Sequence, residues 1–296
     1  MAQQTAHIVD ARYSMPTDVG RDQIINYYGV SSSNRPPAAL SFNDAPIDLL
    51  SSYFTGREHE LDHIGQAFGT SYGSVPTRCA MHGMPGMGKT QLALQYAMRS
   101  YHQQQYSIIF WISGATVEKL NQGLTKVLTL VGHPDRDHPE QSTRLTSARR
   151  WLEESDADGC HKWLLIVDNI AQETVGFLKE HLPRKNTAGN ILLTTRTEAA
   201  AEAGTAVAGQ QHPIIELYAP DLNNAANQLL KEAGVDTSSA DTASINGAKA
   251  LVKCVGCLPL AITHAASLAR QSHKNLDYVL GLYQGTHKFE VRSSAL

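Results

Sequence analysis

The residues best suited to chemistry form one glycine-rich run, Gly83-Met84-Pro85-Gly86-Met87-Gly88-Lys89-Thr90. The run matches the pattern G-x-x-x-x-G-K-[ST], in which the glycines let successive backbone N–H groups point at an anion. In such a loop the lysine, Lys89, reaches the β- and γ-phosphate oxygens, and the hydroxyl of Thr90 binds Mg²⁺. The ordinary alternative is a glycine-rich turn before a helix. Because the lysine and the hydroxyl are both intact, the run predicts a phosphate-binding loop.

Two other segments end apolar runs with a polar side chain. Trp163–Val167 leads into Asp168, and an acid at the carboxyl end of a central strand can hold Mg²⁺ directly or through water. Ile191–Thr195 leads into Arg196, which either contacts the γ-phosphate or is an ordinary surface arginine. We therefore expect Asp168 and Lys89 to be the catalytic residues, and Thr90 and Asp168 to be the Mg²⁺ ligands.

The elements that would position these residues alternate between strands and helices. The predicted strands are Arg78–His82, Tyr106–Ser113, Lys162–Asp168, Asn190–Thr195 and Pro213–Tyr218. The predicted helices between them are Thr90–Tyr101, Val117–Val131, Thr143–Glu154 and Glu173–His181. This alternation predicts an α/β fold, a three-layer sandwich with a central parallel sheet.

The chain is expected to have four parts. Residues 1–50 contain few periodic apolar positions and are expected to be a flexible N-terminal extension. Residues 51–219 would form the α/β domain, and the helical patterns that follow predict a small helical subdomain over 220–285, with a tail over 286–296. Cys254 and Cys257 form a C-x-x-C pair that suits small apolar residues beside a helix better than half of a zinc site.

Charge and composition restrict the class of partner. The 296 residues are 42% hydrophobic and 18% charged, with a net charge of −3, so a packed core is expected. This balance offers no basic surface for nucleic acid or for an anionic membrane. The start of the chain has no leader pattern, and the apolar runs are far shorter than the roughly 18 residues of a membrane span. We therefore expect a soluble, cytoplasmic protein.

With these motifs in this order, the sequence resembles the NB-ARC domain of the STAND class of P-loop NTPases, the NOD-like receptor type. Tyr53-Phe54-Thr55-Gly56-Arg57-Glu58 is similar to the family's entry motif, and Gly256-Cys257-Leu258-Pro259-Leu260-Ala261 is similar to its G-L-P-L-A motif. Local structure alone would also explain both, as a capping box from Thr55 to Glu58 and as a proline in a first helical turn. The resemblance covers about residues 51–285. It is greatest to fungal NB-ARC proteins that carry repeats.

The resemblance implies that the helical part is ARC1-like and that ADP or ATP binds with Mg²⁺ between it and the sheet. It further implies a nucleotide-dependent signalling switch that meets protein partners by self-association or through an effector domain. The nucleotide-binding residues expected from the loop and from the resemblance are Phe54, Arg57, Gly83, Met84, Pro85, Gly86, Met87, Gly88, Lys89, Thr90, Gln91, Arg196 and Pro259.

The sequence departs from the family pattern in two places. Asn169 stands where many relatives carry a second acid, and because an amide cannot act as a general base we expect at most a slow ATPase. The chain also stops at Leu296, before the family's winged-helix subdomain and sensor repeats, so we expect a C-terminally truncated member.

Other function classes remain open. An AAA+-like motor would need a catalytic acid after Asp168, and a small-molecule kinase would need an acceptor base and an arginine-bearing lid. A nucleotide-free interaction module would be expected to have lost part of its phosphate loop.

Overall fold

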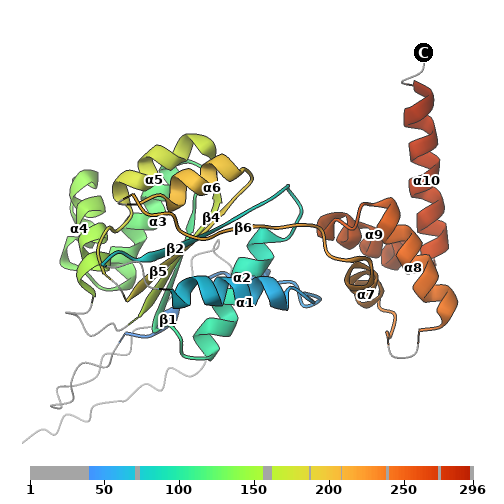
Figure 1. The fold of residues 1–296 in the computed structure, drawn as a ribbon, viewed down its shortest axis with the longest axis horizontal. Coiled ribbons are helices and arrows are strands. Elements are labelled where there is room, and N and C mark those ends of the chain that lie inside the picture. The colour runs from blue at the N-terminus through green and yellow to red at the C-terminus, as the bar shows by residue number, and fades with distance from the viewer. Residues whose placement is uncertain are drawn as a thin grey trace, which may run out of the picture. The chain divides into compact units, whose positions relative to one another are not determined.

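The computed structural model describes residues 40–70, 74–155, 162–186, 188–207, 209–237, 240–272 and 275–293. Its centre is a sheet of six parallel strands in the order β1-β3-β4-β5-β2-β6 (Figure 1). The strands are β1 (Phe42–Asn43), β2 (Thr77–His82), β3 (Ile108–Ser113), β4 (Trp163–Ile170), β5 (Gly189–Thr195) and β6 (Ile214–Glu216).

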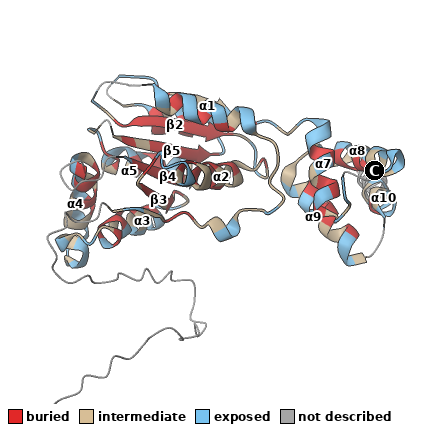
Figure 2. Cartoon of the chain, turned by 90° about the horizontal axis from the view of Figure 1, so that it is seen from below, coloured by how far each residue is buried: buried red, intermediate tan, exposed pale blue. Residues whose placement is uncertain are grey.

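Helices cover both faces of this sheet. They are α1 (Glu58–Gly69), α2 (Lys89–His102), α3 (Val117–Leu130), α4 (Gln141–Glu154), α5 (Val175–His181) and α6 (Glu198–Thr205). Ile108 and Phe110 of β3 pack with α3 and α4, whereas Ile109 between them packs with α1 and α2 on the opposite face. Because both faces are covered, the strands are buried throughout their centres (Figure 2). The predicted three-layer α/β fold is confirmed.

The remaining described chain is helical. It consists of α7 (Leu222–Glu232), α8 (Thr242–Cys254), α9 (Pro259–Ser272) and α10 (Leu276–Ser293), which share an apolar core of their own. Asp221 and Asp241 cap α7 and α8 by accepting hydrogen bonds from backbone N–H groups. Cys254 ends α8, and Cys257, which follows it, packs against the helical core. Within the described ranges, no helix is long and apolar enough to cross a membrane.

The structure adds detail at the expected domain boundaries. Residues 1–39 of the expected extension lie outside the described residues, but Phe42 and Asn43 form β1 and pair with β3. A strand of two residues is too short to show a period in the sequence, which is why it was not predicted. The short 3₁₀ helix Ile47–Leu49 follows it, and α10 continues beyond residue 285 to Ser293.

Candidate functional site

The phosphate loop connects β2 to α2 and depends on glycine at its first position. Gly83 has a φ of +150°, and a Cβ atom there would lie 2.6 Å from the backbone oxygen of Leu217. Gly86 and Gly88 also have positive φ values, of +80° and +88°. Helix α2 begins directly after this loop, at Lys89. The loop therefore ends at the positive end of a helix dipole, where an anion is stabilised.

The ammonium group of Lys89 lies inside the loop. Its Nζ donates hydrogen bonds to the backbone oxygens of Gly83 at 2.6 Å and Met84 at 2.8 Å. Partial burial lowers the pKa of Lys89, Arg196 nearby lowers it further, and Asp168 partly offsets both effects. A phosphate group would counter this loss of solvation, so the position suits an anion.

Two hydroxyl groups meet the carboxylate of Asp168. Thr90 Oγ1 lies 2.9 Å from Asp168 Oδ1 and 3.1 Å from Oδ2, and Thr194 Oγ1 lies 2.6 Å from Oδ1. The arrangement fits Mg²⁺, which prefers hard oxygen ligands, because the two predicted ligands Thr90 and Asp168 lie in contact. Thr194 was not predicted as a site residue, although it belongs to the apolar run that ends at Arg196.

Asn169 occupies an irregularity in β4. Its φ is +59°, and the pairing of β4 with β5 shifts register between Val167 and Ile170. Asparagine tolerates this left-handed conformation better than most residues. The backbone N–H of Asn169 donates to Thr194 Oγ1 at 2.8 Å, so Thr194 supports both Asn169 and Asp168.

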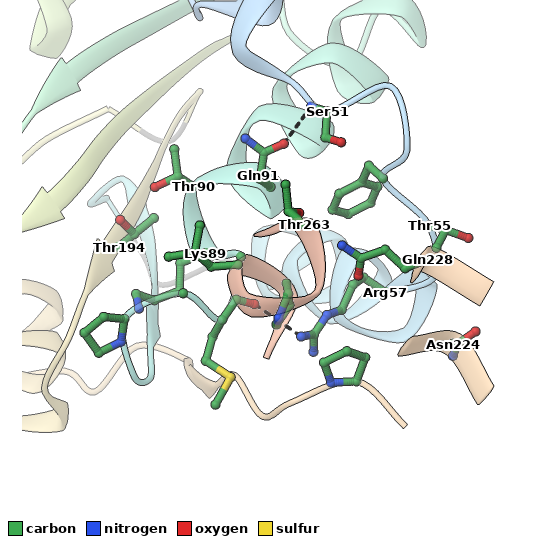
Figure 3. Close-up of a pocket in the computed structure, with 18 of the residues that line it drawn as sticks. Ser51, Thr55, Arg57, Lys89, Thr90, Gln91, Thr194, Asn224, Gln228 and Thr263 are labelled. Atoms are coloured by element: carbon green, nitrogen blue, oxygen red, sulfur yellow. Dashed lines mark hydrogen bonds between the residues drawn. The ribbon is translucent and has the colours of Figure 1, made fainter. Parts of the chain in front are cut away.

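A cavity of about 460 Å³ lies beside Lys89, Thr90, Asn169 and Thr194 (Figure 3). The predicted residues in its wall are Phe54, Arg57, Pro85, Gly86, Met87, Gly88, Lys89, Thr90, Gln91, Arg196 and Pro259. Gly83, Met84 and Asp168 do not line the cavity, but each is hydrogen-bonded to Lys89 or Thr90, which do. The structure therefore brings the predicted set together around one space.

Arg57 joins the entry motif to the phosphate loop. Its NH1 forms an ion pair with Glu60 at 2.6 Å, and its NH2 donates to the backbone oxygen of Met87 at 3.3 Å. The capping box expected between Thr55 and Glu58 does not form. Gly56 and Arg57 both have positive φ values, so α1 begins only at Glu58.

The other side of the cavity comes from the helical part. The backbone N–H of Leu260, at the start of α9, donates to the backbone oxygen of Gly86 at 3.3 Å. On this side the sequence predicted Pro259 but not Pro220, Asn224, Gln228, Glu232, Leu260 or Thr263. The spacing of four between Asn224, Gln228 and Glu232 signals a shared helix face. The spacing does not show which part of the protein this helix face contacts.

The chain is similar to known proteins in sequence and in fold. A model of the NB-ARC domain matches residues 61–236, more than half of the chain. A nucleotide-binding leucine-rich repeat (NLR)-like protein of the fungus Hyaloscypha variabilis is 28% identical over 252 residues, which is 79% of this chain. The chain spans only 24% of the length of that relative.

Two solved structures share the fold at low sequence identity. The ORC2 protein of Aeropyrum pernix, in its ADPNP-ADP complexes, has a TM-score of 0.56 at 14% identity, over 84% of this chain and 75% of that one. Drosophila ORC bound to DNA has a TM-score of 0.56 at 12% identity, over 86% of this chain and 70% of that one. At this identity the likeness concerns the fold alone.

Proposed function

Because the chain belongs to the NB-ARC domain family, we propose that it binds ADP or ATP with Mg²⁺ in this cavity and acts as a nucleotide-dependent signalling switch. The observation that carries the proposal is the contact between Asp168 and Thr90, a residue of the cavity wall, because it joins two motifs that are 78 positions apart. We extend the proposal to a cytoplasmic setting and to protein partners, as for receptors of the NOD-like type.

The polar groups around the phosphate loop, which form the phosphate side of the cavity, each have a separate role in this proposal. Lys89 balances the charge of the terminal phosphates, and the glycine-rich loop supplies backbone donors. Thr90 and Asp168 hold the Mg²⁺ ion, which neutralises phosphate charge when it is bound. Arg196 lies in the same wall, where its guanidinium can bind the γ-phosphate of ATP but finds no such group in ADP.

We propose that hydrolysis is weak because Asn169 cannot accept a proton from an attacking water. Asn169 lines the cavity beside the phosphate loop, where a catalytic acid would have to act. Asn169→Asp should therefore raise steady-state ATP turnover. Ordinary enzymes turn over much faster than about once per minute. An ATP turnover of the wild-type chain well above that rate would contradict this part of the proposal.

The contact between Leu260 and Gly86 supports a switch. It connects the phosphate loop to the first turn of α9, so a change at the γ-phosphate can alter how the helical part is held. A nucleotide shifts such an equilibrium only by its difference in affinity for the two arrangements. We therefore expect ADP and ATP to favour different positions of α9.

The test is the nucleotide content and affinity of the purified chain. Denaturing the protein should release ADP in a nearly equimolar amount, and Lys89→Ala should abolish binding of both ADP and ATP. Lys253→Ala, which removes an exposed lysine of α8 outside the cavity, is the matched control. Unchanged affinities in Lys89→Ala would refute the proposal.

A further inference from the structure

Helix α1 carries two neighbouring histidines on its outer side. Its inner side, with Leu61, Ile64 and Ala67, is buried in the core, whereas His59 and His63 are exposed (Figure 2). Because the two histidines are four positions apart, they lie on the same face of the helix. Their ring centres are 4.0 Å apart, and the rings are inclined by 52°. The two rings are therefore in contact with each other and open to solvent.

Two imidazole rings in this arrangement can chelate one transition-metal ion. Imidazole nitrogen is a preferred ligand of Zn²⁺, Cu²⁺ and Ni²⁺. A metal bound at about 2 Å from each of two nitrogens, with a right angle between the bonds, holds those nitrogens roughly 3 Å apart. Rings that already touch reach this separation by rotation of exposed side chains. The pair therefore offers the ligand type and the spacing of a two-histidine metal site.

The charges around the pair favour a cation. Both neighbouring glutamates, Glu58 and Glu60, form ion pairs with arginines, so their charges are balanced. Asp62 lies between the two histidines in the sequence, is exposed, and forms no ion pair with another described residue. The positive end of the α1 dipole disfavours a cation in the first turns, and the carboxylate of Asp62 opposes this effect.

The same residues belong to a longer pattern. The run His59-Glu60-Leu61-Asp62-His63 matches H-E-x-x-H, in which a helix of a zinc hydrolase supplies two metal ligands and a general base. Such a centre also needs a third protein ligand and a glutamate that is free to accept a proton. Glu60 instead pairs with Arg57 at 2.6 Å, and the described residues contain no group of three or more potential metal ligands. Within those residues the geometry is that of a binding pair rather than a hydrolytic centre.

We propose that His59 and His63 form a binding site for a divalent transition-metal ion, with water in the coordination positions that the pair leaves open. Neither histidine lines the nucleotide cavity, so the inference does not depend on the proposed function. The ion connects two consecutive turns of α1 and binds the folded helix better than the unfolded chain. It therefore stabilises the folded protein.

The experiment uses Ni²⁺ and the untagged full chain in the absence of nucleotide. Isothermal titration calorimetry gives the dissociation constant, and thermal unfolding gives the effect on stability. With free Ni²⁺ at about ten times the dissociation constant, the midpoint of unfolding of the wild type should rise by about 2–4 °C.

His59→Gln and His63→Gln assign the ion to the pair. Because chelation needs both nitrogens, each variant should bind Ni²⁺ at least about tenfold more weakly, and the double variant should lose little more than either single one. The rise in the midpoint should disappear in all three. His264→Gln is the matched control, because it removes an exposed histidine of α9 that has no second histidine three or four positions away.

Three results would overturn the inference. Wild-type Ni²⁺ affinity in the double histidine variant would place the metal elsewhere. Loss of binding in a Cys254→Ser, Cys257→Ser double variant, with binding kept in the histidine variants, would assign the ion to the C-x-x-C pair. No binding at millimolar Ni²⁺ would leave the pair as a ring contact only. The histidine variants should bind ADP as the wild type does, so a failure here leaves the proposed nucleotide site untouched.

Discussion

Two cations, Arg78 in strand β2 and Lys89 after the loop that follows this strand, are held by backbone oxygens in different ways. Arg78 donates to Gly204 at 3.0 Å and to Pro183 at 3.2 Å, at sequence separations of 126 and 105 residues. Lys89 donates to Gly83 and Met84, at separations of six and five residues. Arg78 is 1% exposed, whereas Lys89 lines the cavity.

On this difference we assign Arg78 to the fold and Lys89 to the proposed ligand. Arg78 connects the beginning of β2 to the end of α6 and to the loop before β5, so its contacts join segments that are distant in the sequence. The oxygens that bind Lys89 belong to its own loop, and phosphate oxygens can replace them at little structural cost. Burial lowers the pKa of both groups, that of Arg78 to about 10, with Arg184 and Arg196 respectively adding to the effect.

The largest effect is expected from Arg78→Ala. The change leaves a cavity and removes the donors for two buried backbone oxygens, so the free energy of unfolding should fall by about 3–5 kcal/mol. Urea denaturation measures it. Arg99→Ala, which removes an exposed ion pair with Glu58, should cost less than about 1 kcal/mol.

ADP binding by Arg78→Ala tests the second half of the comparison, the assignment of Lys89 to the ligand. Below its midpoint of thermal unfolding, Arg78→Ala should bind ADP as the wild type does, whereas Lys89→Ala should unfold like the wild type but not bind. Wild-type stability in Arg78→Ala, or a folded Arg78→Ala protein without ADP affinity, would contradict the division of roles.

His212 gives the Arg78 region a pH dependence. Its Nδ1 accepts a hydrogen bond from the backbone N–H of Arg78 at 3.1 Å, and burial together with the charge of Arg78 lowers its pKa to about 4. His212 binds a proton near pH 6.5 in the unfolded chain but only near pH 4 in the folded chain. The free energy of unfolding should therefore fall by about 2 kcal/mol as the pH decreases through this range.

His212→Asn is the informative variant for this pH dependence. The side-chain oxygen of asparagine can accept the hydrogen bond from Arg78, but it does not titrate, so part of the acid sensitivity should disappear. Denaturation curves at several pH values between about 7 and 4.5 measure the slope. An identical slope in the variant would assign the acid sensitivity to carboxylates instead.

The phosphate side of the site could be predicted because its chemistry lies within consecutive residues. Glycines that permit positive φ, followed by Lys89 and Thr90 at the start of a helix, fix the local geometry whatever surrounds them. Asp168 could be placed next to them because parallel strands end at a common edge. The sheet was predictable for a similar reason, since buried parallel strands are continuously apolar.

The other side of the site depends on tertiary contacts that no local pattern encodes. Asn224, Gln228 and Glu232 have ordinary helix-surface character, and only the approach of α9 and the loop makes their face a wall of the cavity. The expected capping box at Thr55 does not form because Gly56 and Arg57 both have positive φ values, which the four-residue pattern does not show. The side chain of Arg57 bonds to Glu60 and to Met87 of the distant phosphate loop.

Thr194→Val sharpens the comparison within the phosphate side. The change removes the hydroxyl that donates to Asp168 and accepts from Asn169, so affinity for ATP in the presence of Mg²⁺ should fall about tenfold. Affinity for ADP in EDTA should change little. The adjacent Thr195→Val is the matched control, because Thr195 donates to the backbone oxygen of Ile170 instead. Equal losses in both variants would show a merely structural role for Thr194.

The smallest effect is expected from the pH dependence of ADP affinity. In the free chain the pKa of Lys89 is below its ordinary 10.5, and a bound phosphate raises it by adding negative charge beside the ammonium group. The protonated form binds better, so affinity is full below the pKa of the free chain and falls as the pH rises through it. We expect a decrease of a few-fold as the pH rises toward 10.5.

Lys89→Arg tests whether the titration of Lys89 causes the pH dependence of ADP affinity. Arginine keeps its charge throughout this range, so the variant should bind more weakly at every pH but with a flatter dependence. If Lys89→Arg shows the same decrease as the wild type, the titrating group is not Lys89, and its ammonium is held by the loop as firmly as Arg78 is held by the sheet.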